Sequence, residues 1–142
     1  MTDMAGIIFT GLAAVFVALV VWMRWLAPKM AGVRTISLDQ YRQHFKKEKH
    51  VFIDVRSESE YAAGHIPRAR NIPLDTIARE PDNIRKQIPD DRALVLICAS
   101  GNRSAVAATA LARAGFSPVY NISGGMSAWK SAGLALQREK QS

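Results

Sequence analysis

Side chains that form disulfides or bind metals are scarce in this sequence of 142 residues, which contains one cysteine, Cys98. A single cysteine cannot form an internal disulfide, so the disulfide-dense class of small secreted domains is excluded. The three histidines, His44, His50 and His65, are scattered along the chain, and no cluster has zinc-ligand spacing. We therefore expect no metal site and no other cofactor, and we expect any thiol chemistry to depend on Cys98.

Positive charge is absent from the first 23 residues, in which Asp3 is the only charged side chain. The chain as a whole has 19 Lys and Arg against 12 Asp and Glu, a formal net charge of +7. Such an excess could serve nucleic-acid binding, but no basic patch is interleaved with aromatic residues and no nucleic-acid motif occurs. We expect no nucleic-acid partner, because basic residues beside an apolar segment also suit anionic lipid headgroups.

Residues 4–23 carry no charge. As a helix these twenty residues would span about 30 Å, the thickness of the hydrocarbon layer of a bilayer. Trp22 and Trp25 suit the interfacial aromatic belt at its end. A buried core helix is the first alternative, but the segment is too uniformly apolar for so small a domain to cover. A cleaved signal peptide is the second, and it would need a positive n-region. The sequence predicts one uncleaved N-terminal transmembrane helix.

The charges that flank this segment predict its orientation. Arg24, Lys29 and Arg34 follow it, whereas Asp3 precedes it. The positive-inside rule then puts the N-terminus outside and the remaining chain in the cytoplasm, as for a single-pass protein of a bacterial inner membrane. A reducing compartment also suits a free thiol. We expect residues 1–32 to form the anchor and linker, and residues 33–142 to form one domain.

Short apolar runs rich in β-branched residues alternate with helical patterns through this domain. A capping box of Ser37 and Gln40 predicts a helix start, and Gly115 suits a left-handed cap. The predicted strands are 51–55, 69–72, 93–97 and 119–122, and the predicted helical stretches are 57–63, 74–79, 82–88, 104–114 and 126–132. The polar tail from Gln137 is expected to fray. Such alternation predicts an α/β fold, a parallel sheet covered by helices on both faces.

Cys98 lies between the predicted strand 93–97 and the helix that follows it. Open α/β sheets place their chemistry at this point. Unpaired N–H groups of the turn and the helix dipole favour an anion there, Arg103 adds a positive charge, and Gly101 permits a tight turn. These effects predict that the pKa of the Cys98 thiol is low. A cysteine after an apolar run is also typical of a small core residue, and that reading stays open.

Three ordered motifs resemble the rhodanese (sulfurtransferase) family: residues 54–73, the loop Cys98-Ala-Ser-Gly-Asn-Arg103, and residues 119–129. The resemblance covers about residues 34 to 136. It implies the rhodanese-like α/β fold and a structural role for the Asp54 and Arg56 pair and for the His65 turn. Arg68 departs from the pattern, in which glycine is common. We expect Cys98 to be the catalytic nucleophile and the loop to bind substrate through Ala99, Ser100, Gly101, Asn102, Arg103 and Ser104.

The sequence therefore predicts a membrane-anchored sulfurtransferase that carries sulfane sulfur as a Cys98 persulfide. The partners would be a small donor such as thiosulfate, or a persulfidated protein, and a thiol or cyanide acceptor. Cysteine-based phosphatases use a Cys-x5-Arg loop, whereas the spacing from Cys98 to Arg103 is one residue shorter, which disfavours phosphoryl transfer. The alternative is a membrane-tethered rhodanese-like binding or regulatory module with little catalysis.

Overall fold

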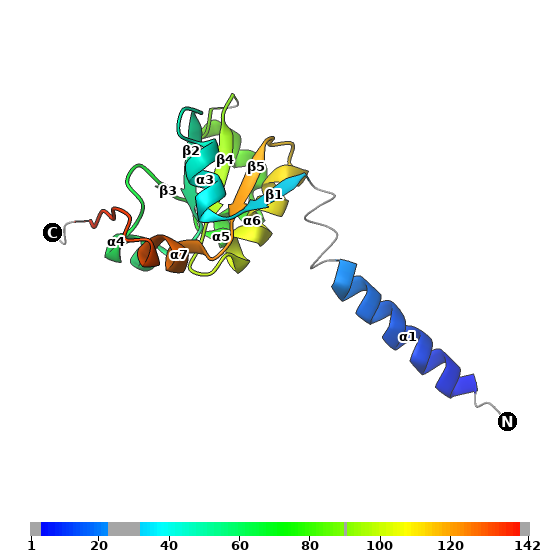
Figure 1. Ribbon diagram of the computed structural model, residues 1–142. Helices are drawn as coiled ribbons and strands as arrows, with labels where there is room; N and C mark the ends of the chain where they lie inside the picture. The colour runs from blue at the N-terminus through cyan, green and yellow to red at the C-terminus, as the bar shows by residue number, and fades with distance from the viewer. Residues whose placement is uncertain (1–3, 23–31, 90, 140–142) are drawn as a thin grey trace.

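The computed structural model describes residues 4–22, 32–89 and 91–139 of the chain. Five strands form one sheet, in the order β1-β5-β4-β2-β3 (Figure 1). Every neighbouring pair in this sheet is parallel. The strands are β1 (Val33–Ile36), β2 (His50–Asp54), β3 (Arg70–Asn71), β4 (Ala93–Ile97) and β5 (Val119–Ile122). The predicted parallel α/β sheet is confirmed, and all its strands end at one edge.

Four of these strands lie where the sequence predicts them, and β4 and β5 have the predicted bounds. The prediction missed β1, a run of four residues of which Arg34 and Thr35 are exposed. Its pattern is too short and too polar to indicate a strand on its own. Pairing with β5 along its whole length supplies the missing stabilisation, because the backbone groups of β1 find partners there.

Helices cover both faces of the sheet (Figure 1), as predicted. The side chains of β2 and β4 alternate between two apolar clusters, since successive residues of a strand point to opposite faces. Ile77, Ile84 and Leu111 fill one cluster, whereas Leu38, Met126 and Trp129 fill the other. The helices are α3 (Leu38–His44), α4 (Glu58–Ala63), α5 (Leu74–Arg79), η2 (Pro81–Lys86), α6 (Asn102–Arg113) and α7 (Gly125–Ser131).

Local sequence signals account for most helix boundaries. The predicted capping box at Ser37 and Gln40 forms at the start of α3, and Ser57 and Glu60 form a second at the start of α4. Gly115 has the left-handed conformation expected of a helix cap, with φ at +92°. The stretch predicted as helical over 82–88 is a 3₁₀ helix, η2, which begins at Pro81.

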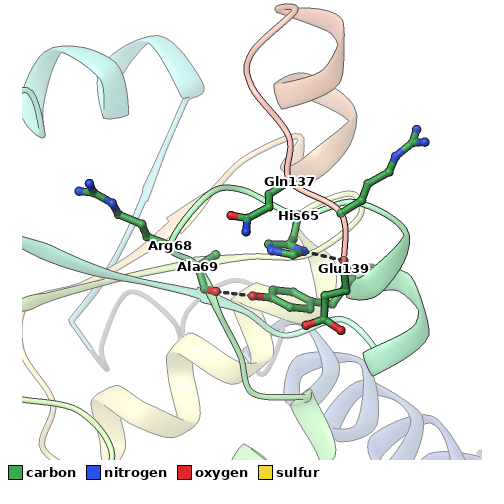
Figure 2. A pocket seen from close by; sticks show the side chains of 7 residues that line it. His65, Arg68, Ala69, Gln137 and Glu139 are labelled. Carbon is green, nitrogen blue, oxygen red and sulfur yellow. Dashed lines mark hydrogen bonds between the residues drawn. The ribbon is translucent and has the colours of Figure 1, made fainter. Parts of the chain in front are cut away.

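The C-terminal tail is more ordered than predicted up to Glu139. Gln137 forms an antiparallel bridge with His65, and the N–H of Glu139 donates to the carbonyl of Ala62. A pocket of about 620 Å³ lies between this tail and the segment around His65 (Figure 2). Its lining residues are Tyr61, His65, Arg68, Ala69, Gln137, Arg138 and Glu139, so no residue of the 98–104 loop takes part.

The N-terminal segment forms helix α1 (Met4–Val21), which ends before the predicted end of the apolar run; Met23 lies outside the described residues. Every α1 side chain whose burial is described is exposed. Within residues 4–22, 32–89 and 91–139, no helix is long and apolar enough to cross a membrane. The predicted transmembrane helix is therefore not found among the described residues.

Gly125, the first residue of α7, tests the contact between this helix and the loop after β4. Its φ is +50°, and a Cβ there would overlap the carbonyl oxygen of Cys98 and the backbone of Ala99. We expect Gly125→Ala to lower the free energy of unfolding by more than about 3 kcal/mol. Gly133→Ala is the matched control, because its φ is also positive but its surroundings are open, and we expect it to cost about 1 kcal/mol. Urea unfolding of the full chain measures both; equal losses would contradict the close contact.

Candidate active site

Cys98 lies at the carboxyl edge of the sheet, directly after β4. The N–H of Val55 donates to the carbonyl of Ile97, so β2 and β4 remain paired up to the residue before the cysteine. Cys98 continues the alternation of Leu94 and Leu96, and it therefore faces the side of the sheet that α6 covers. The sequence places a thiol at this edge through strand register, and the structure confirms that position.

Two groups of the loop hold the sulfur at hydrogen-bond distance. The backbone N–H of Gly101 donates to the sulfur over 3.0 Å, and the Ser104 hydroxyl lies 3.3 Å from it. Gly101 reaches this position with φ at +100°, and a Cβ there would lie 3.2 Å from the carbonyl oxygen of Ile122. The positive φ therefore favours glycine at this point, and the close backbone of Ile122 leaves little room for a side chain.

The pKa of the Cys98 thiol is lowered in this setting. Burial alone would raise the pKa, because desolvation disfavours the thiolate. Hydrogen bonds from the Ser104 hydroxyl and from the N–H groups of Ser104, Ser100 and Gly101 oppose that effect, and together they outweigh it. A lowered pKa means that more of the sulfur is in its nucleophilic form at neutral pH.

The sulfur is nevertheless covered. Cys98 is 0% exposed and belongs to the apolar cluster on the α6 side of the sheet. The reading of this residue as a buried core side chain therefore describes its packing correctly. It does not describe its polar contacts, since the loop amides are directed at the sulfur. In this conformation a donor can reach the sulfur only after the loop shifts.

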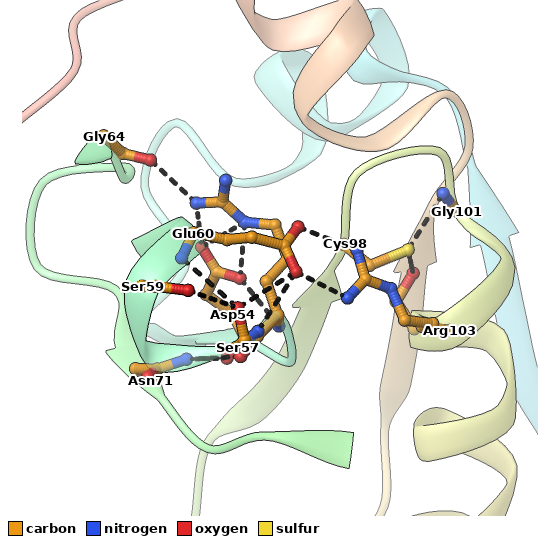
Figure 3. A network of polar contacts seen from close by, with 11 residues as sticks. Asp54, Ser57, Ser59, Glu60, Gly64, Asn71, Cys98, Gly101 and Arg103 are labelled. Atoms are coloured by element: carbon orange, nitrogen blue, oxygen red, sulfur yellow. Dashed lines mark hydrogen bonds and ion pairs between the residues drawn. The ribbon is translucent and has the colours of Figure 1, made fainter. Parts of the chain in front are cut away.

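Asp54 and Arg56 form a buried ion pair at the end of β2. Arg56 Nη2 lies 2.7 Å from Asp54 Oδ2 and also donates to the Gly64 carbonyl over 2.7 Å. The Asn71 amide donates to the carbonyls of Asp54 and Arg56 (Figure 3). The pair ties β2, the end of α4 and β3 together, which agrees with the structural role that the resemblance implies.

His65 and Arg68 take part in the turn after α4. His65 is buried, with Nδ1 at 2.8 Å from the carbonyl of Tyr61, and its ring stacks on that of Tyr61. The structural reading of this histidine therefore agrees with its contacts. Arg68 stands where the family often has glycine, and it adopts the left-handed conformation itself, with φ at +68°.

Arg103 forms an ion pair that the sequence did not predict. Its two terminal nitrogens donate to the two carboxylate oxygens of Glu60 over 2.8 and 2.9 Å, and no hydrogen bond between its side chain and the Cys98 sulfur is found (Figure 3). The guanidinium lowers the pKa of Glu60 to about 2, chiefly through these hydrogen bonds. The carboxylate in turn raises the pKa of Arg103. Arg103 is thus already paired, and its charge is largely balanced by Glu60.

The other loop residues take different positions. The carbonyl of Ala99 accepts hydrogen bonds from Ser127 of α7, whereas Ser100 and Asn102 are exposed. Gly101 and Ser104 are buried. The structure therefore brings Ser100, Gly101 and Ser104 to the sulfur and leaves Ala99, Asn102 and Arg103 in the loop around it.

Sequence reasoning missed Glu60 and Asn121. Glu60 is visible in the sequence as the third helical residue of a capping box, but its bond to Arg103 joins positions 43 residues apart. Asn121 is a buried polar residue in β5. Its side-chain oxygen accepts from the Ser104 hydroxyl over 2.6 Å, and its amide donates to the Gly101 carbonyl over 3.3 Å. A lone polar residue in an apolar strand is a signal that could have indicated this role.

The described part of the chain contains no group of three or more His, Cys, Asp or Glu side chains placed to hold a metal ion. The chemistry available to the loop is that of a thiolate with neutral hydrogen-bond donors around it. Such a site can attack a sulfur atom and can then stabilise the small anion that results.

Ser104→Ala tests the source of the lowered pKa. Removing a hydroxyl that bonds the thiolate should raise the pKa of Cys98, because the thiolate loses a hydrogen-bond donor. Ser127→Ala is the control, because that hydroxyl donates to the Ala99 carbonyl and not to the sulfur. Below the pH range in which the three tyrosines ionise, the ultraviolet absorbance of the thiolate reports Cys98, since it is the only cysteine. An unchanged titration in Ser104→Ala would contradict the assignment.

Comparisons with known proteins agree with this geometry. The family model described as "Rhodanese-like domain" matches residues 37–132. The chain is 37% identical over 102 residues to "Thiosulfate sulfurtransferase GlpE" of Pseudomonas putida, covering 72% of this chain and 89% of that protein. It is 34% identical over 97 residues to "Uncharacterized protein YqhL" of Bacillus subtilis, covering 68% and 72%. The crystal structure of a rhodanese-like domain protein from Staphylococcus aureus superposes with a TM-score of 0.63 at 33% identity, covering 75% of this chain and 99% of that one. The chain therefore belongs to the rhodanese-like domain family.

Proposed function

We propose that this protein is a sulfurtransferase that carries sulfane sulfur as a persulfide on Cys98. The observation that carries the proposal is the placement of the sulfur, which accepts a hydrogen bond from the Gly101 N–H at 3.0 Å and has a lowered pKa. A thiolate is the form of cysteine that attacks sulfur. Similarity to a thiosulfate sulfurtransferase over most of that protein's length supports the same activity.

The transfer takes place in two displacements. The Cys98 thiolate attacks the sulfane sulfur of a donor, and the bond between that sulfur and the rest of the donor breaks. The new terminal sulfur carries the negative charge, and the loop amides and the Ser104 hydroxyl would stabilise it. An acceptor nucleophile then attacks the terminal sulfur and releases the Cys98 thiolate. The loop residues Ala99, Ser100, Gly101, Asn102, Arg103 and Ser104 would form the binding site for the transferred atom.

The single cysteine determines how the persulfide is discharged. With no second thiol in the chain, Cys98 cannot form an internal disulfide that would release the sulfur. The acceptor must come from outside: a low-molecular-weight thiol, a protein thiol, or cyanide in an assay.

In this proposal residues 33–142 form the catalytic domain, and residues 1–32 form its N-terminal attachment.

A second candidate is a rhodanese-like binding module with little catalysis. The complete burial of the Cys98 side chain favours it, because an enzyme must expose the sulfur to a donor during each cycle. Intact hydrogen bonds around the sulfur favour the enzyme, because a module without catalysis has no need to lower the pKa of this thiol.

Sulfur loading of Cys98 separates these two candidates. Incubation of the full chain with thiosulfate or an alkyl persulfide should add one sulfur atom, seen by intact mass, and cyanide should remove it. Cys98→Ala should show no adduct. Glu58→Gln serves as a control, because it changes an exposed side chain on α4, outside the 98–104 loop. An unmodified wild-type chain with either donor would favour the binding module.

The apolar N-terminal helix supports a further part of the proposal, attachment to a membrane with the domain in the cytoplasm. The exposed side chains of α1 include Ile8, Phe9, Leu12 and Phe16. So much exposed apolar surface on one helix needs a cover, and a lipid layer is a suitable one. The basic residues that follow the segment favour the cytoplasmic side for the domain.

Leu12→Lys tests this attachment. A charge in the middle of a lipid-embedded helix costs about 3 kcal/mol, so the variant should leave the membrane fraction in part or in full. Val106→Lys is the control, because it puts the same charge at an apolar side chain that is 59% exposed on α6 and not on α1. Carbonate washing of membranes followed by quantification of the full chain gives the result. A wild-type chain found entirely in the wash would contradict membrane attachment.

A further inference from the structure

Two arginines at the carboxyl edge of the sheet are each paired with a carboxylate, and the pair of Arg103 with Glu60 is drawn with Cys98 in Figure 3. Arg56 is bound to Asp54 in the buried pair at the end of β2. Arg103 is bound to Glu60 through both terminal nitrogens. The four side chains sum to zero formal charge. The groups that contact the sulfur, the Gly101 N–H and the Ser104 hydroxyl, are neutral dipoles.

Glu60 is held in place independently of Arg103. Its Oε1 accepts from the Ser57 hydroxyl over 3.1 Å and from the Ser57 N–H over 3.4 Å, as part of the capping box of α4. The side chains of Arg103 and Glu60 are 40% and 38% exposed, so an incoming donor meets this pair at the surface. Arg103 belongs to the loop that begins at Cys98, and the charge of Cys98 contributes to the raised pKa of Arg103.

We propose that Glu60 determines donor specificity: by neutralising Arg103 it directs Cys98 toward thiol persulfides and away from the thiosulfate dianion. This inference rests on the proposed function, since it assumes that Cys98 accepts sulfur. Thiosulfate brings two negative charges to a thiolate, and a site without a free cation leaves all of that repulsion uncompensated. A thiol persulfide carries at most one negative charge, so the thiolate repels it less than it repels thiosulfate.

Sulfur loading from either donor uses the Cys98 thiolate as the nucleophile, and atoms and charges balance in both reactions. With a persulfide, the thiolate Cys98–S⁻ attacks the outer sulfur of R–S–SH. The bond between the two donor sulfurs breaks, and the products are Cys98–S–SH and R–S⁻. With thiosulfate, the thiolate attacks the sulfane sulfur, the bond to the sulfonate sulfur breaks, and the products are Cys98–S–S⁻ and sulfite. No oxidant or reductant is consumed in either reaction.

The proposal differs from what similarity alone suggests, because one relative is named a thiosulfate sulfurtransferase. It also explains how Arg103 can be retained in a loop that binds weakly charged donors. The carboxylate keeps the guanidinium in a defined position while cancelling its attraction for a second negative charge. Glu60 stays ionised at any neutral or mildly acidic pH, since its pKa is about 2.

The test compares two donors in the full chain. Thiosulfate and the persulfide of N-acetylcysteine methyl ester are each mixed with the wild type, Glu60→Gln and Glu58→Gln. Single-turnover loading of Cys98 is followed by intact mass at low ionic strength. Gln can still serve in the capping box, so α4 should remain folded. Glu58 lies exposed on the same helix and is the matched control.

We expect Glu60→Gln to raise the ratio of the thiosulfate rate to the persulfide rate about tenfold, and high salt to reduce that gain. Glu58→Gln should leave the ratio within about twofold of the wild type, because distant exposed charges are screened. Arg103→Gln should shift the ratio in the opposite direction, and it provides a second measurement if Glu60→Gln fails to fold. An unchanged or lowered ratio in folded Glu60→Gln would overturn the proposal. A wild-type Cys98 that takes sulfur from neither donor would instead refute the proposed function itself.

Discussion

At 3.0 Å, the hydrogen bond from the Gly101 N–H to the Cys98 sulfur forms only when three segments hold their positions. β4 must deliver Cys98 to the edge of the sheet, and the loop must turn through the left-handed conformation of Gly101. The first N–H groups of α7 must then secure the loop, as Met126 does by donating to the Cys98 carbonyl over 2.8 Å. The loop geometry is therefore a property of the whole sheet edge.

In this arrangement two effects change the pKa of the Cys98 thiol in opposite directions. Packing against the apolar side of α6 removes water from the sulfur and raises its pKa. Hydrogen bonds from the loop lower the pKa, and they are strong because water does not compete for them. Asn121 positions two residues of the loop, since its side-chain oxygen accepts from the Ser104 hydroxyl and its amide donates to the Gly101 carbonyl. The single hydroxyl proton of Ser104 is therefore shared between Asn121 and the sulfur. A buried sulfur can therefore ionise only while this small polar network stays complete.

The parts of the structure that were predictable from the sequence are those with local causes. The strand 93–97, the helix 74–79 and the capping box at Ser37 depend on neighbouring residues, and the structure has all three. The strand β1 and the pairing of Gln137 with His65 depend on partners far along the chain, and both were missed. The ion pair of Arg103 with Glu60 was missed for the same reason, because Glu60 belongs to a different motif.

The two arginine pairs at the carboxyl edge of the sheet differ in exposure, and they therefore affect stability and chemistry differently. Arg56 and Asp54 are buried and bond to the backbone around them, so loss of either charge would leave the other uncompensated inside the protein. Arg103 and Glu60 are partly exposed, so solvent and salt screen them and either can change at small cost to folding. The buried pair therefore maintains the shape of the sheet edge, whereas the exposed pair can vary the charge that a sulfur donor meets. On the proposed mechanism, donor preference can thus change at positions 60 and 103 while the fold around Cys98 stays the same.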